Sequence, residues 1–100
     1  MARFDRAAME QHAINDLGAT PDASGKADMT YDKGALIFAA EPADMKAAFK
    51  RIKKVDGYRW VMINKEDLFA ANTLSLGSKA GMITADGETL KNADIPRRKV

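Results

Sequence analysis

The most constraining feature of this sequence is an amphipathic segment over residues 42–55. Its apolar residues recur at intervals of three and four, the spacing of one face of an α-helix: Met45, Ala48, Phe49, Ile52 and Val55. Pro42 suits the first turn of a helix, and the pair Asp56-Gly57 follows where a helix would stop. The sequence therefore predicts a helix over 42–55 with one buried side and one solvated side.

Two further segments have helical character. Residues 3–17 place five apolar residues at helical spacing, and Gly18 stands where a C-terminal cap belongs. Residues 65–74 follow Asn64, a candidate N-cap, and could form a helix, but a strand over 68–76 fits the same sequence almost as well. Between the first two helices, residues 19–26 are rich in proline, glycine and small polar side chains, which predicts a flexible loop.

Strand signals fill the rest of the chain. Residues 27–40 read as a β-hairpin around Asp32-Lys33-Gly34, and residues 81–91 read as a second hairpin around Asp86-Gly87. Residues 58–63 are aromatic and β-branched, and alternation puts Tyr58, Trp60 and Met62 on one face of that strand. The unbroken apolar run 36–38 indicates a strand that is covered on both faces.

These elements predict one α+β domain spanning residues 1–100, with an extended basic tail over 92–100. We expect a small antiparallel sheet of about four or five strands, with two or three helices packed mainly on one face. The chain has no cysteine, which excludes disulfides and thiolate chemistry and suits a reducing, cytoplasmic location. Its longest apolar stretch, residues 35–40, is far shorter than the ~20 residues of a membrane span, so we expect no membrane association.

Charge is distributed unevenly along the chain. Residues 1–45 contain four basic and eight acidic side chains, whereas residues 46–65 contain seven basic side chains and one acidic one. Residues 66–100 contain five of each. A short block therefore holds the positive charge, and such asymmetry can steer an anionic partner.

The basic block predicts a candidate binding surface. Four lysines share the outer side of the 42–55 helix, and two arginines lie nearby: Lys46, Lys50, Lys53, Lys54, Arg51 and Arg59. Tyr58 and Trp60 follow, so bases of a nucleic acid could stack beside the cations. The simpler interpretation is a solvated helix face and a tryptophan in the core.

Catalytic and metal-binding patterns are weak. His12 is the sole histidine, and the serines at 24, 75 and 78 do not stand in a nucleophile-elbow context. Residues 77–81 only partly match a phosphate-binding loop and read as a turn, while Glu66 and Asp67 suit a helix start. The sequence therefore predicts no catalytic residue, no metal site and no cofactor.

Our leading hypothesis is a non-catalytic module that docks stoichiometrically onto a protein with an acidic surface. An adaptor, an assembly subunit or an inhibitor would act in this way, and small accessory proteins of phages and mobile elements fit the description. The alternative is a nucleic-acid-binding protein that uses residues 46–54 with Tyr58 and Trp60, and a small enzyme ranks third. The opposed charges of residues 1–45 and 46–65 also permit self-association.

Overall fold

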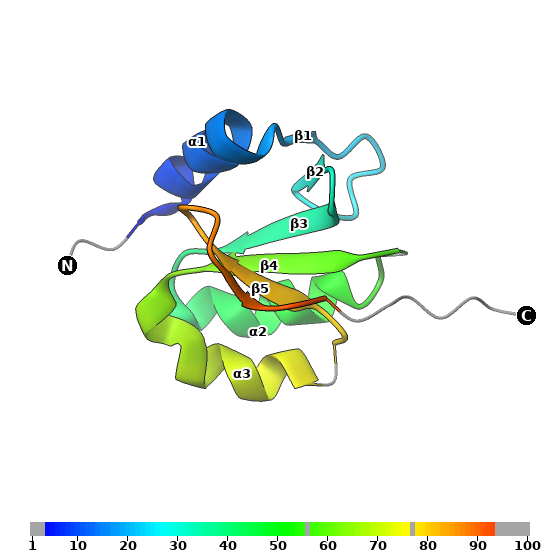
Figure 1. Cartoon of the computed structure of the whole chain (residues 1–100). Helices are drawn as coiled ribbons and strands as arrows, with labels where there is room; N and C mark the ends of the chain where they lie inside the picture. Colours follow the sequence, from blue (N-terminus) through cyan, green and yellow to red (C-terminus); the bar gives the residue numbers. More distant parts are fainter. Residues whose placement is uncertain (1–3, 56, 77, 94–100) are drawn as a thin grey trace, which may run out of the picture.

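The computed structural model describes residues 4–55, 57–76 and 78–93, and it has an α+β fold. Three helices, α1 (Arg6–Leu17), α2 (Pro42–Ile52) and α3 (Leu68–Leu76), accompany a six-stranded sheet in this part of the chain (Figure 1). The strands are β1 (Thr20–Pro21), β2 (Met29–Tyr31), β3 (Gly34–Ala39), β4 (Arg59–Ile63), β5 (Gly81–Thr84) and β6 (Thr89–Lys91). The predicted class is confirmed, and the strands lie side by side in chain order.

The sheet is mixed, so the prediction of an antiparallel sheet was wrong for its centre. β3 pairs with β4 in parallel, and β4 pairs with β5 in parallel, while the outer pairs are antiparallel. Helix α2 connects the first parallel pair, and helix α3 connects the second. A helical crossover returns the chain to the end where the previous strand began, so the next strand runs in the same direction.

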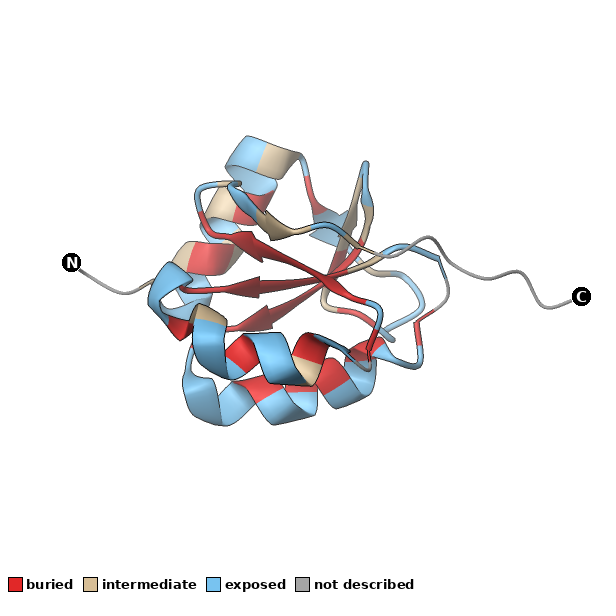
Figure 2. Ribbon diagram, turned by 60° about the horizontal axis from the view of Figure 1, so that its bottom comes forward, coloured by how far each residue is buried: buried red, intermediate tan, exposed pale blue. Residues whose placement is uncertain are grey.

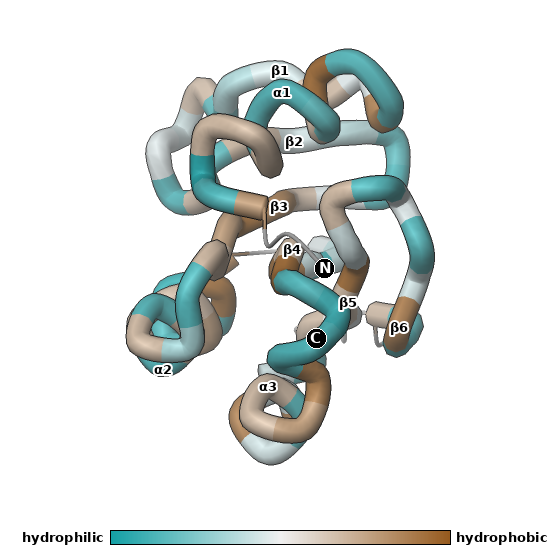
Figure 3. Tube along the Cα trace, turned by 90° about the vertical axis from the view of Figure 1, so that its left-hand side faces the viewer, coloured by the Kyte–Doolittle hydropathy of each residue, from teal (hydrophilic) through white to brown (hydrophobic). Residues whose placement is uncertain are grey.

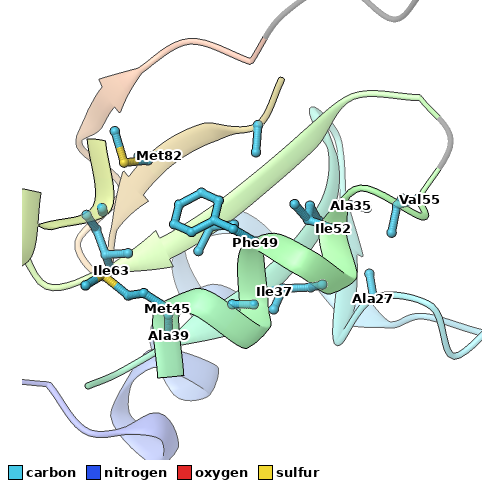
Figure 4. Close-up of a cluster of buried hydrophobic side chains, with 14 residues drawn as sticks. Ala27, Ala35, Ile37, Ala39, Met45, Phe49, Ile52, Val55, Ile63 and Met82 are labelled. Carbon is cyan, nitrogen blue, oxygen red and sulfur yellow. The ribbon is translucent and has the colours of Figure 1, made fainter. Parts of the chain in front are cut away.

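Helices cover both faces of this sheet. Helix α1 packs Met9 and Ala13 against Leu36, Phe38 and Trp60 on one face. Helices α2 and α3 pack on the other face, where Phe49 and Ile52 meet the inner side chains of β3, β4 and β5 (Figure 4). Continuous burial along the three central strands follows from this coverage and fits the apolar run that the sequence contains.

Local sequence explains most element boundaries. The Asp5 carboxylate accepts a hydrogen bond from the Ala8 N–H at 2.8 Å and begins α1, and Gly18 ends it with a left-handed φ of 68°. Helix α2 ends at Ile52, three residues before the predicted end. Residues 65–76 form a 3₁₀ turn (Lys65–Asp67) followed by α3, so the helix interpretation was correct and the strand interpretation was not.

The two predicted hairpins are confirmed as β2–β3 and β5–β6. The predicted loop over 19–26 contains the two-residue strand β1, which the sequence did not reveal. Asp22 stabilises the rest of this loop, because its carboxylate accepts hydrogen bonds from the Ser24 and Ala27 N–H groups. These bonds lower the pKa of Asp22, and the bond from Ala27 has the largest effect. Residues 94–100 of the predicted basic tail lie outside the described residues.

Candidate docking surface on helices α2 and α3

Four lysines lie on the outer side of α2 and of the turn that follows it. Lys46 and Lys50 belong to the helix, and Lys53 and Lys54 belong to the turn. The Lys54 N–H donates to the Arg51 carbonyl at 3.1 Å, which keeps this turn compact. All four residues are exposed, and none forms an ion pair with another residue that the structure describes. We call these four residues the lysine row.

Arg51 has a different environment from the lysine row. Its Nη1 lies 3.2 Å from Asp28 Oδ1, and its Nη2 donates to the Lys26 carbonyl at 3.4 Å. Arg6 of α1 reaches the same Asp28 oxygen at 3.2 Å, and its guanidinium lies 5.5 Å from the centre of the Phe38 ring. Arg51 therefore joins α2 to the segment before β2, and it shares the Asp28 carboxylate with Arg6.

Arg59 is also engaged inside the protein. It is half-buried at the start of β4, where its Nε donates to the Val55 carbonyl at 2.6 Å. Its Nη1 donates to the Ser78 carbonyl at 3.0 Å. These bonds tie together the loops at the amino-terminal ends of β4 and β5. The structure thus separates Arg51 and Arg59 from the four lysines with which the sequence groups them.

The two candidate stacking residues lie in contrasting environments. Trp60 is only 5% exposed, its Nε1 donates to the Lys33 carbonyl at 3.0 Å, and Tyr31 contacts the ring edge-on. Tyr58 is 45% exposed at the end of the segment before β4. The alternation expected for this strand is confirmed, because Trp60 and Met62 pack with α1 whereas Val61 and Ile63 pack with α2.

Helix α3 contributes a surface that the sequence interpretation missed. Phe69 is 93% exposed and Leu76 is 68% exposed, and both lie on the side of the helix opposite the buried Ala71 and Ser75. No residue from 68 to 76 carries a charge. The absence of charge over residues 68–76 could have indicated this apolar surface. It did not, because the sequence fitted a strand almost as well as a helix, and the outward side differs between the two.

The lysine row and this apolar side belong to neighbouring helices. Helices α2 and α3 pack against each other beneath the sheet, and both turn an exposed side outward (Figures 2 and 3). Arg51 marks the flank of α2 that faces Asp28 and β2. At ~100° per residue, Lys46 and Lys53 lie roughly 140–160° around the helix from Arg51, on the flank toward α3. Lys46 and Lys53 therefore lie on the flank of α2 nearest α3, and Phe69 and Leu76 form a separate exposed apolar side of α3.

The candidate catalytic residues make local structural contacts. His12 Nδ1 lies 2.9 Å from Asp16 Oδ2, one helical turn away, and Phe4 contacts the ring edge-on. The Ser24 hydroxyl donates to Asp22, and the Ser78 hydroxyl donates to the Ser75 carbonyl and caps the turn that precedes β5. Asp67 is buried while Glu66 is exposed, so the two carboxylates point apart.

A cleft of about 370 Å³ lies at the carboxyl ends of the parallel strands, the edge where open α/β sheets often bind ligands. Its polar groups are bonded to one another. Lys65 Nζ lies 3.3 Å from Glu88 Oε2, and the Thr84 hydroxyl donates to Asp86, which lowers the pKa of that carboxyl. The cleft therefore presents few unsatisfied groups to a ligand.

The described ranges are residues 4–55, 57–76 and 78–93. They contain no cluster of three or more histidine, cysteine, aspartate or glutamate residues that could hold a metal ion. They also contain no helix with the length and apolar character needed to cross a membrane.

Comparison with protein families, curated proteins and solved structures finds no match to this chain. Any function must therefore rest on the exposed residues of this chain and their chemistry.

Proposed function

We propose that this protein is a non-catalytic module that docks stoichiometrically onto an acidic surface of a protein partner through the lysine row. The observation that carries the proposal is the exposure of four cations without an ion pair among the described residues. A folded chain gains little from concentrating like charges on one helix and its turn, because neighbouring lysines repel one another. Complementary acidic groups on a partner would relieve that repulsion and accelerate association.

A protein partner accounts for the surface better than a nucleic acid does. Trp60 is buried, and Arg51 and Arg59 are engaged by Asp28 and by backbone carbonyls. Arginine is the cation best suited to bidentate contact with phosphate, and aromatic stacking is the usual partner of such contacts in single-strand binding. The cations that remain are lysines, which cannot make bidentate contacts with phosphate.

The test is a charge reversal with a matched control. The variant K46E/K50E/K54E reverses three members of the lysine row, and K26E/K33E/K79E makes the same change in charge at exposed lysines elsewhere. A protein captured from host cells with the wild-type chain is purified and titrated calorimetrically against all three proteins. We expect defined stoichiometry with the wild type and the control, and affinity at least about 100-fold weaker with the first variant.

Two outcomes would overturn the proposal. Equal affinity of the two variants, with unchanged circular dichroism spectra, would show that the lysine row does not bind the partner. Micromolar binding of an oligonucleotide that weakens with salt with a logarithmic slope of about −3 to −4 would identify a nucleic acid as the target of the same cations.

A further inference from the structure

A cavity of about 320 Å³ opens at the edge of β3, where the pairing of this strand with β2 ends. Strand β2 pairs with β3 only as far as Leu36, and Asp28 covers part of the edge beyond it, because Asp28 Oδ2 accepts from the Phe38 N–H at 3.1 Å. Helices α1 and α2 flank the opening from opposite faces of the sheet (Figure 1). The cavity therefore lies at the carboxyl end of a parallel strand, a position where open α/β sheets often bind ligands.

Two arginines from different helices line this cavity and meet at one carboxylate oxygen. Arg6 of α1 and Arg51 of α2 each lie 3.2 Å from Asp28 Oδ1. Arg6 also pairs with Glu10, and Arg51 also donates to the Lys26 carbonyl. A guanidinium has five N–H donors, and these contacts with described residues engage two nitrogens of each arginine, so both keep donors for a ligand. The two side chains are about half exposed and are suited to binding one further carboxylate.

Asp44 contributes the opposite charge to the same cavity. It lies seven residues before Arg51 in α2, so the two share one side of the helix and are about 10 Å apart along its axis. The cavity-lining residues between them, Ala47 and Ala48, are small. Asp44 is exposed and forms no ion pair with another residue that the structure describes. One side of α2 thus carries a carboxylate at one end of the cavity and a guanidinium at the other.

This mixed lining indicates the chemistry of the ligand. Asp44 would repel a simple anion, and Arg6 and Arg51 would repel a simple cation. A ligand with one carboxylate and one ammonium group can place each group beside its opposite charge. The remaining lining is mainly apolar and includes Ile37 and Phe38, so it suits a hydrocarbon portion of the ligand. The volume is near the lower end of the range of ligand pockets, about 300–1,000 Å³, so the ligand is small.

We propose that this cavity binds a small amino acid, with the carboxylate of the ligand held by Arg6 and Arg51 and its ammonium group beside Asp44. The lysine row does not line the cavity. The inference therefore does not depend on the proposed docking function, and either can fail without the other.

The test is a titration of the nitrogen-15-labelled full chain with each of the standard amino acids, followed by NMR. β-Alanine and γ-aminobutyrate are included because their charged groups are farther apart, so the best ligand reports the preferred separation. We expect at least one of these compounds to shift amide resonances within residues 37–48 saturably, with a dissociation constant of about 1 mM or tighter. Acetate and ethylamine each carry only one of the two charges and should bind at least about tenfold more weakly, because one charge-assisted contact is lost.

Two variants separate the charge of the cavity from its shape. Asp44→Asn should weaken binding of the best amino acid at least about tenfold and should not weaken binding of acetate. Ala47→Leu fills the cavity without a change of charge and should weaken binding of every ligand. The controls Asp32→Asn and Ala70→Leu make the same substitutions at exposed positions outside the cavity and should leave binding unchanged. All four positions are exposed, so each variant should keep the wild-type circular dichroism spectrum.

Four results would overturn the inference. The first is the absence of a saturable shift with any of the amino acids at about 10 mM. The second is binding of acetate or inorganic phosphate that is as tight as that of the best amino acid and is insensitive to Asp44→Asn, which would identify a simple anion site. The third is equally tight binding of ethylamine, which would identify a cation site. The fourth is amino-acid binding that Ala47→Leu leaves unchanged, which would place the ligand elsewhere on the protein.

Discussion

The side chain of Asn64 forms both hydrogen bonds of a strand pair with the backbone of Phe4. Asn64 Oδ1 accepts from the Phe4 N–H at 2.9 Å, and Nδ2 donates to the Phe4 carbonyl at 3.0 Å. The same Nδ2 donates to the Ala40 carbonyl at 2.9 Å. A single amide that is 2% exposed therefore connects the segment before α1 with the ends of β3 and β4.

Replacing Asn64 with Ala should lower the free energy of unfolding by about 2–4 kcal/mol, because two part-buried hydrogen bonds to Phe4 and one buried hydrogen bond to Ala40 are lost. Urea denaturation measures this change, and amide exchange at Phe4 should accelerate in the variant. The control Asn15→Ala removes an exposed amide from α1 and should change stability by about 0.5 kcal/mol or less. Equal effects of the two substitutions would show that the Asn64 bonds contribute nothing specific.

Removing the hydroxyl of Tyr31 should affect stability in the opposite direction. Its hydroxyl is buried and has no hydrogen-bond partner within the ranges that the structure describes. Removing an unsatisfied buried group relieves its desolvation penalty, so Tyr31→Phe should be neutral or stabilising by up to about 1 kcal/mol at pH 7. A loss of more than that in urea denaturation would indicate that the hydroxyl has a partner after all.

The same residue predicts the pH dependence of stability at high pH. Burial, with a smaller contribution from Asp32, raises the pKa of Tyr31 to about 12. In the unfolded chain this phenol ionises near pH ~10, whereas in the folded chain it keeps its proton until about pH 12. Ionisation therefore favours the unfolded chain first, and the free energy of unfolding falls as the pH rises from ~10 toward 12. The wild type should therefore lose stability over this range relative to Tyr31→Phe. Parallel stability profiles of the two proteins would contradict the raised pKa.

Substitution of Asp28 would show how much its contacts with Arg6 and Arg51 contribute to the free energy of unfolding. Its Oδ2 accepts from the Phe38 N–H at 3.1 Å, while Oδ1 receives Arg6 and Arg51, whose side chains are about half exposed. Exposed ion pairs contribute about 0–1 kcal/mol, whereas an unpaired N–H in a buried strand costs more. We expect Asp28→Ala to cost about 2–3 kcal/mol, with little change in that cost between 0.1 M and 1 M NaCl. If high salt removed most of the cost, the ion pairs would be the larger contribution.

Local patterns in the sequence were sufficient to predict α2, both hairpins and the alternation along β4. Each depends on residues within one element, such as the repeat of Met45, Phe49 and Ile52 or the turn at Asp86-Gly87. The parallel pairing of β3 with β4 was not predicted, because it depends on contacts between residues such as Ala35 and Arg59, which are distant in the chain.

The candidate site was predictable only in part, for the same reason. Periodicity located the lysine row, but it could not show that Asp28, 23 residues away, binds Arg51. Nor could it show that Val55 and Ser78 engage Arg59. The apolar side of α3 was missed because its inward side is formed by small residues, Ala71 and Ser75, which carry no clear amphipathic signal.

Gly34 offers a final prediction, since it lies where β3 begins and approaches the segment before β4 closely. Its φ of 134° is strained for other residues, and an added Cβ would overlap the Tyr58 carbonyl oxygen and lie 2.8 Å from the Tyr58 Cβ. Because the Ala35 N–H bonds to that same carbonyl at 3.0 Å, the backbone cannot yield without breaking the first contact between β3 and β4. Gly34→Ala should therefore lower the free energy of unfolding by about 3 kcal/mol or more.

Gly25→Ala is the matched control, because Gly25 also has a positive φ of 73° but open space around it. This substitution should lower the free energy of unfolding by only about 1–2 kcal/mol. Thermal and urea unfolding of both variants measure the difference, and equal costs would mean that the contact with Tyr58 relaxes freely.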